Sequence, residues 1–322
     1  MVITSANIRT WSRLGQRGAI FGTALGELAK NDPKICVVTA DLGLLSGLER
    51  FRAAYPERYI NTGIAEQNLV GIAAGLAKEG NCVFATTYAT FITMRSFEQI
   101  RHNLGYLGYK VIIVGSSAGV VMGMSGNTHY AIEDIALMRA IPNMTVLSPA
   151  DSGEAVKMVE ALVGTDGPAY LRLTGELNCP VVYKEDYPFE IGKGIVLKKG
   201  CHVAIIAIGT MVAEALEAAD LLKEEGVSCT VVDMHTIKPL DTDLLDQLFA
   251  DHRLVVTVEE HSRIGGLGGA VAEYKSNFAK MPPQIRIGLP DAFGKAGEYR
   301  YLLEQYGLTA AGISKTIREE LR

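Results

Sequence analysis

The sequence predicts an α/β protein, in which a first domain with a mostly parallel sheet flanked by helices precedes a smaller α/β domain. Of its 322 residues, 48% are hydrophobic and 21% are charged, a balance typical of a globular chain with apolar residues for two cores. Short β-branched runs alternate with longer segments of helical period, as parallel strands alternate with their connecting helices. The alternation stops over Asn178–Gly200, where Pro and Gly recur, and then resumes.

The first unit interleaves short strands with helices. The expected strands are Ile35–Thr39, Cys82–Thr86, Val111–Val114, Thr145–Leu147 and Ala169–Leu173. The expected helices are Ala19–Lys30, Glu66–Lys78, Thr93–Leu107, Ile132–Ala140 and Ser152–Leu162. Ser152 opens a helical run and Gly80 follows one, which agrees with the usual chemistry of helix ends. We therefore expect a first domain over residues 1–180.

The second unit repeats this alternation after a linker. Pro180, Pro188 and Gly192 lie in a stretch rich in Tyr and charge that has no regular period, so we expect a linker over residues 181–194. The strands expected beyond it are Val203–Ile208, Ser228–Asp233, Leu254–Val258 and Gln284–Ile287. The helices are Val212–Glu225, Asp241–Phe249, Gly268–Phe278 and Ala310–Leu321. These elements predict a second domain over residues 195–322.

Charge and hydropathy exclude several kinds of partner. The net charge is −5, so the chain has no basic surplus to neutralise nucleic-acid phosphates or anionic lipid. The N-terminus lacks a secretory pattern, and the most apolar stretch, Val111–Met124, is interrupted by Gly and Ser. The five cysteines include no C-x-x-C pair. We expect a cytoplasmic protein whose partners are proteins and small molecules, with idle thiols and no metal ligands of its own.

The most informative motif is Gly63–Asn68, which reads Gly-Ile-Ala-Glu-Gln-Asn at the start of a small-residue helix. Taken alone, Glu66 could be a surface carboxylate that complements the helix dipole. Further along come Tyr88–Arg101, then Gly-Asn-Thr-His ending at His129, and then Ser148–Asp151. Together these motifs predict a functional site rather than a cap.

The order of these motifs over Arg17–Arg172 resembles the pyrimidine-binding domain of transketolases and deoxyxylulose-phosphate synthases. The segment Ile195–Gly269, with Val255–Glu260 and a Gly-Gly-Leu-Gly-Gly run, is similar to their C-terminal domain. This resemblance implies an enzyme that uses thiamine diphosphate to transfer a two-carbon ketol unit from a ketose to an aldehyde. The cofactor ylid would be the carbon nucleophile.

The resemblance also implies cofactor-binding residues. Glu66 would hydrogen-bond the aminopyrimidine ring nitrogen and favour the imino tautomer that generates the ylid. Tyr88 and Phe91 would stack on the aminopyrimidine face, and Asp41 and Arg95 would lie close to the cofactor. The alternatives are that Tyr88 and Phe91 are core aromatics and that Asp41 is a turn residue at a strand end.

Substrate contacts are implied in the same way. His129 would be catalytic and contact the sugar oxygens near the reacting carbon, although it could instead be a satisfied polar group beside a helix start. Arg17 and Arg172 would hold an anionic tail of the sugar through their guanidinium groups, or each could form an ordinary ion pair. Ser125 stands where the family usually has an acidic residue, so we expect a substrate contact there with an altered sugar pocket.

One missing motif predicts a partner. Thiamine-diphosphate enzymes carry a Gly-Asp-Gly stretch followed by Asn, which holds the divalent metal of the diphosphate, and this sequence has no Gly-Asp-Gly. We therefore expect the C-terminal subunit of a split transketolase. An N-terminal subunit would hold Mg²⁺ and the diphosphate, in an α2β2 heterotetramer with the site at the interface. The alternatives are the β subunit of a 2-oxo-acid dehydrogenase, a deoxyxylulose-phosphate-synthase-like enzyme, or a non-catalytic subunit of this fold.

Overall fold

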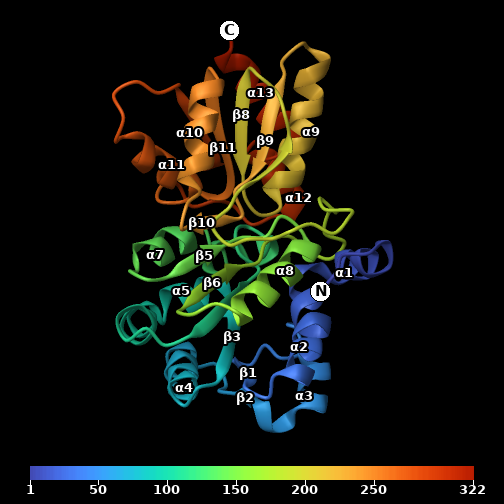
Figure 1. Ribbon diagram of the computed structural model, residues 1–322, viewed down its shortest axis with the longest axis vertical. Coiled ribbons are helices and arrows are strands. Elements are labelled where there is room, and N and C mark those ends of the chain that lie inside the picture. Colours follow the sequence, from blue (N-terminus) through green and yellow to red (C-terminus); the bar gives the residue numbers. More distant parts are fainter.

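The computed structural model describes residues 1–322 and contains two sheets, one above the other in Figure 1. The larger sheet has seven strands in the order β10-β5-β6-β4-β3-β1-β2. Its strands are β1 (Ile35–Thr39), β2 (Tyr59–Asn61), β3 (Cys82–Tyr88), β4 (Val111–Ser116), β5 (Thr145–Leu147), β6 (Ala169–Arg172) and β10 (Thr236–Lys238). All pair in parallel except β10, which lies antiparallel to β5. The carboxyl ends of the parallel strands therefore lie at one edge of this sheet.

Helices cover both faces of the larger sheet, and its central strands are therefore buried on both sides. Along β1, Ile35 and Val37 pack into one apolar cluster, whereas Cys36 and Val38 pack into another. The covering helices are α1 (Ser5–Ala19), α2 (Leu25–Asn31), α3 (Glu49–Ala54), α4 (Glu66–Lys78), α5 (Ala89–Met94), α6 (Phe97–Gln99), α7 (Asp134–Ala140) and α8 (Ser152–Val163). A π-helical turn, Ile20–Ala24, joins α1 to α2, and another, Ile100–Tyr106, follows α6.

The second sheet has five strands in the order β12-β11-β8-β9-β7, with only β7 antiparallel to its neighbour. The strands are β7 (Ile195–Lys198), β8 (Val203–Ala207), β9 (Cys229–Asp233), β11 (Leu254–Ser262) and β12 (Gln284–Leu289). Its helices are α9 (Met211–Glu224), α10 (Thr242–Asp251), α11 (Leu267–Lys275), α12 (Tyr299–Gln305) and α13 (Ala310–Glu320). The predicted fold class, two mostly parallel α/β units of unequal size, is confirmed.

The two units share an apolar cluster. One apolar cluster contains Val83 and Ile113 of the larger sheet together with Ile206 and Val232 of the smaller one. Strand β10, which the sequence did not predict, follows β9 but completes the larger sheet beside β5. Lys238 anchors it, since its Nζ donates to the carbonyl oxygens of Arg139 and Ile141 at 3.0 and 2.6 Å.

Several predicted elements differ from the structure. The predicted helix Thr93–Leu107 is wrong as a single element, because α5 ends at Met94 and a turn precedes α6. The short helices α3 and α12 and most of α1 were not predicted. The strand β7 was not predicted either, and its residues show no alternating pattern of burial. None of the helices combines the length and apolar character needed to cross a membrane.

The linker is held by buried carboxyl groups rather than hanging free. Tyr183 donates from its hydroxyl to Asp233 Oδ2 at 2.8 Å, and Tyr187 donates to Glu154 Oε1 at 3.1 Å. The two tyrosine rings stack with centroids 4.0 Å apart. Burial raises the pKa of Asp233 to about 7, although its bonds to Tyr183 and Glu154 oppose this rise. Burial, with the nearby Asp233 charge, also raises the pKa of Glu154.

The raised pKa of Asp233 predicts that the stability of the fold depends on pH, and that Asp233→Asn reduces this dependence. Because the folded-state pKa is raised, the contribution of Asp233 to stability is fully present only below its unfolded-state pKa and is lost progressively as the pH rises to about 7. The asparagine stays neutral, so we expect the free energy of unfolding of Asp233→Asn, relative to wild type, to improve by about 2 kcal/mol between pH 5 and pH 8. Urea unfolding at both pH values measures it. Asp243→Asn, at an exposed carboxylate, is the control, and parallel pH curves for Asp233→Asn and wild type would contradict the expectation.

Candidate active site

Glu66 is a nearly buried carboxylate at the first residue of α4. Its relative exposure is 5%, and Arg95 Nη1 donates to its Oε1 at 3.0 Å. Arg95 itself is half-exposed, so the pair joins the interior to the surface. No hydrogen bond within the chain reaches Glu66 Oε2. The position combines the favourable field of a helix N-terminus with one carboxylate oxygen that is available to a ligand.

Aromatic rings lie beside this pair. Tyr88 ends β3 and Phe91 lies in the first turn of α5, with ring centroids 6.0 Å apart. The His129 ring lies 5.3 Å from that of Phe91 and 6.2 Å from that of Tyr88. The Arg95 guanidinium carbon lies 4.1 Å from the Phe91 ring centroid, which is cation–π distance. Glu66, Arg95, Phe91, Tyr88 and His129 thus form one cluster, which we call the Glu66 cluster.

His129 directly follows a 3₁₀ turn, Gly123–Thr128. Its Nδ1 lies 2.9 Å from Thr128 Oγ1, so the neighbouring hydroxyl fixes the orientation of the ring. Ser125 lies in the same turn with an exposed side chain. It is separate from the cavity described next, whose lining includes Met122 from this part of the chain.

A cavity of about 320 Å³ opens beside the cluster and is lined by Tyr88, Arg17 and Ser117. The rest of its lining is contributed by Leu14, Gly15, Gln16, Leu45, Val121, Met122, Leu173, Thr174, Gly175, Glu176 and Leu177. Burial lowers the pKa of Arg17 from its usual value, and Tyr88 partly offsets this effect. A cation in a partly enclosed cavity is suited to bind an anionic group.

Sequence reasoning missed Gln16, which supports this cavity from behind. Its side chain is 3% exposed. Gln16 Nε2 donates to the Pro149 carbonyl at 2.8 Å, and its Oε1 accepts from the Thr174 amide at 3.0 Å. The amide thus ties α1 to the segments after β5 and β6. Only the position of Gln16 next to Arg17 hinted at this role.

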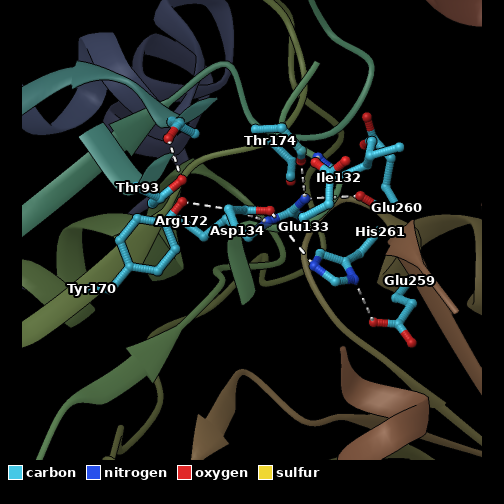
Figure 2. A network of polar contacts seen from close by, with 12 residues as sticks. Thr93, Ile132, Glu133, Asp134, Tyr170, Arg172, Thr174, Glu259, Glu260 and His261 are labelled. Atoms are coloured by element: carbon cyan, nitrogen blue, oxygen red, sulfur yellow. Dashed lines mark hydrogen bonds and ion pairs between the residues drawn. The ribbon is translucent and has the colours of Figure 1, made fainter. Parts of the chain in front are cut away.

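Arg172 does not fit its predicted role as a substrate contact. Its side chain is 1% exposed and its Nε donates to Asp134 Oδ2 at 2.7 Å, an oxygen that also accepts from the Tyr170 hydroxyl at 2.6 Å (Figure 2). Arg172 Nη2 donates to the carbonyl oxygens of Ala131 and Glu260 at 3.2 and 2.8 Å. The guanidinium is used inside the protein, where it links the two units.

Asp41 makes the contacts of a strand-end turn. Its backbone has a φ of +56° and its side chain is exposed. Asn61 Nδ2 donates to Asp41 Oδ1 at 3.1 Å, and the Asp41 amide donates to Asn61 Oδ1 at 3.0 Å. These bonds hold the ends of β1 and β2 together, and none joins Asp41 to the Glu66 cluster.

The chain contains no group of three or more His, Cys, Asp or Glu side chains placed to hold a metal ion.

Comparison with known proteins identifies the family. Residues 16–179 match the transketolase pyrimidine-binding domain, and residues 192–313 match the transketolase C-terminal domain. The chain belongs to the transketolase family. The predicted resemblance to its C-terminal half is confirmed, because the chain is 41% identical, over 94% of its own length and 95% of the relative's, to a transketolase C-terminal section of Methanocaldococcus jannaschii.

Other relatives of this transketolase-family chain differ in length and named substrate. A 6-deoxy-6-sulfo-D-fructose transketolase subunit of a Clostridium species is 39% identical, covering 91% of this chain and 90% of that one. A 1-deoxy-D-xylulose-5-phosphate synthase of Chlorobium luteolum is 38% identical over 94% of this chain, which spans only 48% of that protein. A split-gene transketolase structure, described as an inactive beta4 tetramer, superposes with a TM-score of 0.85 at 43% identity and covers 95% of this chain and 97% of that one.

Proposed function

We propose that this chain is the C-terminal subunit of a transketolase-type transferase, which moves a two-carbon ketol unit from an anionic ketose to an aldehyde. The observation that carries the proposal is the Glu66 cluster. It sets a buried carboxylate with an available oxygen beside aromatic rings, one of which, Tyr88, also lines the cavity that contains Arg17. Members of this family use thiamine diphosphate, which, when bound, supplies the carbon nucleophile.

The residues of the cluster fit the aminopyrimidine part of that cofactor. Glu66 Oε2 would hold a proton at a ring nitrogen, while Arg95 keeps the carboxylate oriented through Oε1. Tyr88 and Phe91 offer aromatic faces for a flat heterocycle. Asp41 has no contact with the cluster, so its role as a cofactor residue depends on the sequence resemblance alone.

Substrate binding would fall to the cavity and its rim. His129, oriented by Thr128, would donate to a sugar hydroxyl or carbonyl oxygen. Arg17 would bind the anionic tail, and Ser125 would face the sugar from the exposed turn. Because Ser125 and Ser117 provide neutral hydroxyls, we propose that the ketose differs from an ordinary pentose phosphate in its body or its anion.

A donor screen tests this function. The chain is mixed with the N-terminal transketolase subunit that carries Gly-Asp-Gly, with Mg²⁺ and thiamine diphosphate, and is given phosphorylated, sulfonated and neutral ketoses with an aldehyde acceptor. We expect ketol transfer from an anionic ketose. Decarboxylation of pyruvate or of a branched 2-oxo acid without ketol transfer would instead identify a 2-oxo-acid dehydrogenase subunit.

The partner requirement makes a separate prediction for the chain on its own. The chain has no three-ligand metal group of its own, and we propose that the partner holds Mg²⁺ and the diphosphate in an α2β2 assembly. We therefore expect the purified chain to be folded and inactive, with no Mg²⁺-dependent thiamine-diphosphate binding in calorimetry. Adding the partner should restore binding. Micromolar, Mg²⁺-dependent binding to the chain alone would move the diphosphate site into this subunit.

A further inference from the structure

One loop of the first unit carries much of the candidate substrate site. This site loop, Ser117–Ala131, runs from the end of β4 to the residues before α7. Ser117, Val121 and Met122 line the cavity, and His129 belongs to the Glu66 cluster. The two ends of the loop are closed by a pair of backbone bonds between Gly119 and Ala131, at 2.8 and 3.0 Å.

The second unit supplies further anchors for the loop. Glu260, near the end of β11, accepts the Val120 amide on its Oε1 at 2.7 Å. The same carboxylate accepts the Tyr299 hydroxyl on its Oε2, also at 2.7 Å. Toward the other end of the loop, Asn127 exchanges two hydrogen bonds with the backbone of Gly294, at 2.6 and 2.9 Å. The position of the loop therefore depends on a unit that contributes no residue to the cavity or the Glu66 cluster.

Gly119 is required for the Glu260 contact. Its φ is +74°, a backbone conformation that residues other than glycine rarely adopt. A Cβ at this position would lie 2.1 Å from Glu260 Oε1, well inside the sum of the van der Waals radii. The absence of a side chain is what allows the carboxylate to reach the Val120 amide.

Glu260 occupies an unfavourable place for a carboxylate. It is 1% exposed, and burial raises its pKa to about 7, although Arg172 and the bonds from Tyr299 and Val120 oppose this rise. Figure 2 shows Glu260 where β11 meets the segment of Ile132 and Glu133, close to Arg172. A buried carboxylate costs stability unless hydrogen bonds compensate. The Glu260 carboxylate accepts two such bonds, one from the Val120 amide of the loop and one from the Tyr299 hydroxyl.

We propose that Glu260 is a positioning residue for ketose binding. Through the Val120 amide it fixes the site loop, so that Ser117, Val121 and Met122 keep the shape of the cavity. The second unit thereby controls ketose affinity without contacting the sugar. This inference rests on the proposed ketol-transfer function, since it assigns a determinant of substrate binding to that same cavity.

The test compares variants that break the contact with one that keeps it. Glu260→Ala removes the acceptor, and Gly119→Ala pushes the carboxylate away. In both, assayed with the partner subunit, we expect the KM for the ketose to rise about tenfold or more while kcat changes less than about threefold. Glu260→Gln retains an amide oxygen for Val120 and should keep a KM within about twofold of wild type. Thiamine-diphosphate affinity should stay unchanged throughout.

Hydrogen exchange provides a readout that needs no activity. Exchange of the Val120 amide and of the site loop should accelerate in Glu260→Ala and Gly119→Ala but not in Glu260→Gln. The matched control is Asp241→Ala, because Asp241 is another buried carboxylate of the second unit that accepts a backbone amide, that of Leu244 at 3.2 Å, and it has no hydrogen bond to the site loop or to α12. It should lower overall stability and leave loop exchange as in wild type.

A wild-type KM or unchanged loop exchange in Glu260→Ala would overturn the inference, as would loop exchange that rises equally in Asp241→Ala. If Glu260→Ala does not fold, Tyr299→Phe decides, since it removes one of the two bonds on the carboxylate and should raise KM and loop exchange in the same direction. Failure of the proposed function is distinguishable, because the wild-type pair would then use no ketose while the exchange results would still hold.

Discussion

Glu66→Gln is expected to lower kcat for ketol transfer about 100-fold or more while cofactor affinity stays nearly unchanged. The amide has the shape of the carboxylate and can still accept a bond from Arg95 on its oxygen. It cannot, however, take up and return a proton at the atom where Glu66 Oε2 would act. The effect should therefore appear in kcat at saturating cofactor rather than in binding.

The measurement is steady-state ketol transfer by the chain reconstituted with its partner, together with calorimetric titration of thiamine diphosphate. Glu98→Gln is a matched control, since Glu98 is an exposed carboxylate nearby that pairs only with Arg101 at 3.2 Å. It should behave as wild type. Near-wild-type turnover in Glu66→Gln would remove Glu66 from the mechanism and leave its helix N-terminus as a structural feature.

The regular elements were predictable because their hydrophobic pattern is local. The strands β1 and β5 and the helix α4 were predicted with the bounds that the structure shows. Buried parallel strands are continuous apolar runs, and α4 follows a small-residue helical pattern. The prediction of one helix over Thr93–Leu107 was wrong because the hydrophobic period continues through the turn between α5 and α6. A local pattern of this kind does not show where one helix ends and the next begins.

Contacts between the two units could not be predicted. β10 is three residues long and is stabilised by a strand distant in sequence, so its own residues give no strand signal. The same reason explains Arg172, which the resemblance placed in the substrate site. Its partners Asp134 and Glu260 come from segments that only the folded chain brings together. Gly119 and Glu260 also form a pair that no local motif reveals.

Most of the predicted cofactor residues lie together in the structure. Glu66 and Arg95 lie in separate predicted elements, and Tyr88, Phe91 and His129 were each assigned from the family's motif order; the structure brings all of them together. Gln16 was missed because a buried glutamine that bonds two backbone groups has no sequence signature. The residues of the Glu66 cluster are thus more visible in this sequence than Gln16, which supports the cavity beside them.

The second large effect is expected for Arg17. We expect Arg17→Ala to lower kcat/KM about 100-fold for an anionic ketose and to change it less than about threefold for a neutral one, because a charge-assisted bond to the tail is lost. Arg17 is the cation that lines the cavity, whereas Arg172 is enclosed with Asp134. An exposed neighbour on α1, Arg13, gives the control Arg13→Ala, which should match wild type.

Specificity constants for phosphorylated, sulfonated and neutral ketoses measure this effect and also identify the anion. A guanidinium binds either oxyanion, so Arg17→Ala should weaken both anionic classes, and the class that wild type prefers identifies the natural tail. The relative named for a sulfonated fructose makes sulfonate a necessary member of the panel. A wild-type preference for neutral ketoses that survives Arg17→Ala would exclude an anionic tail, and recognition would then depend on His129, Ser117 and the cavity shape.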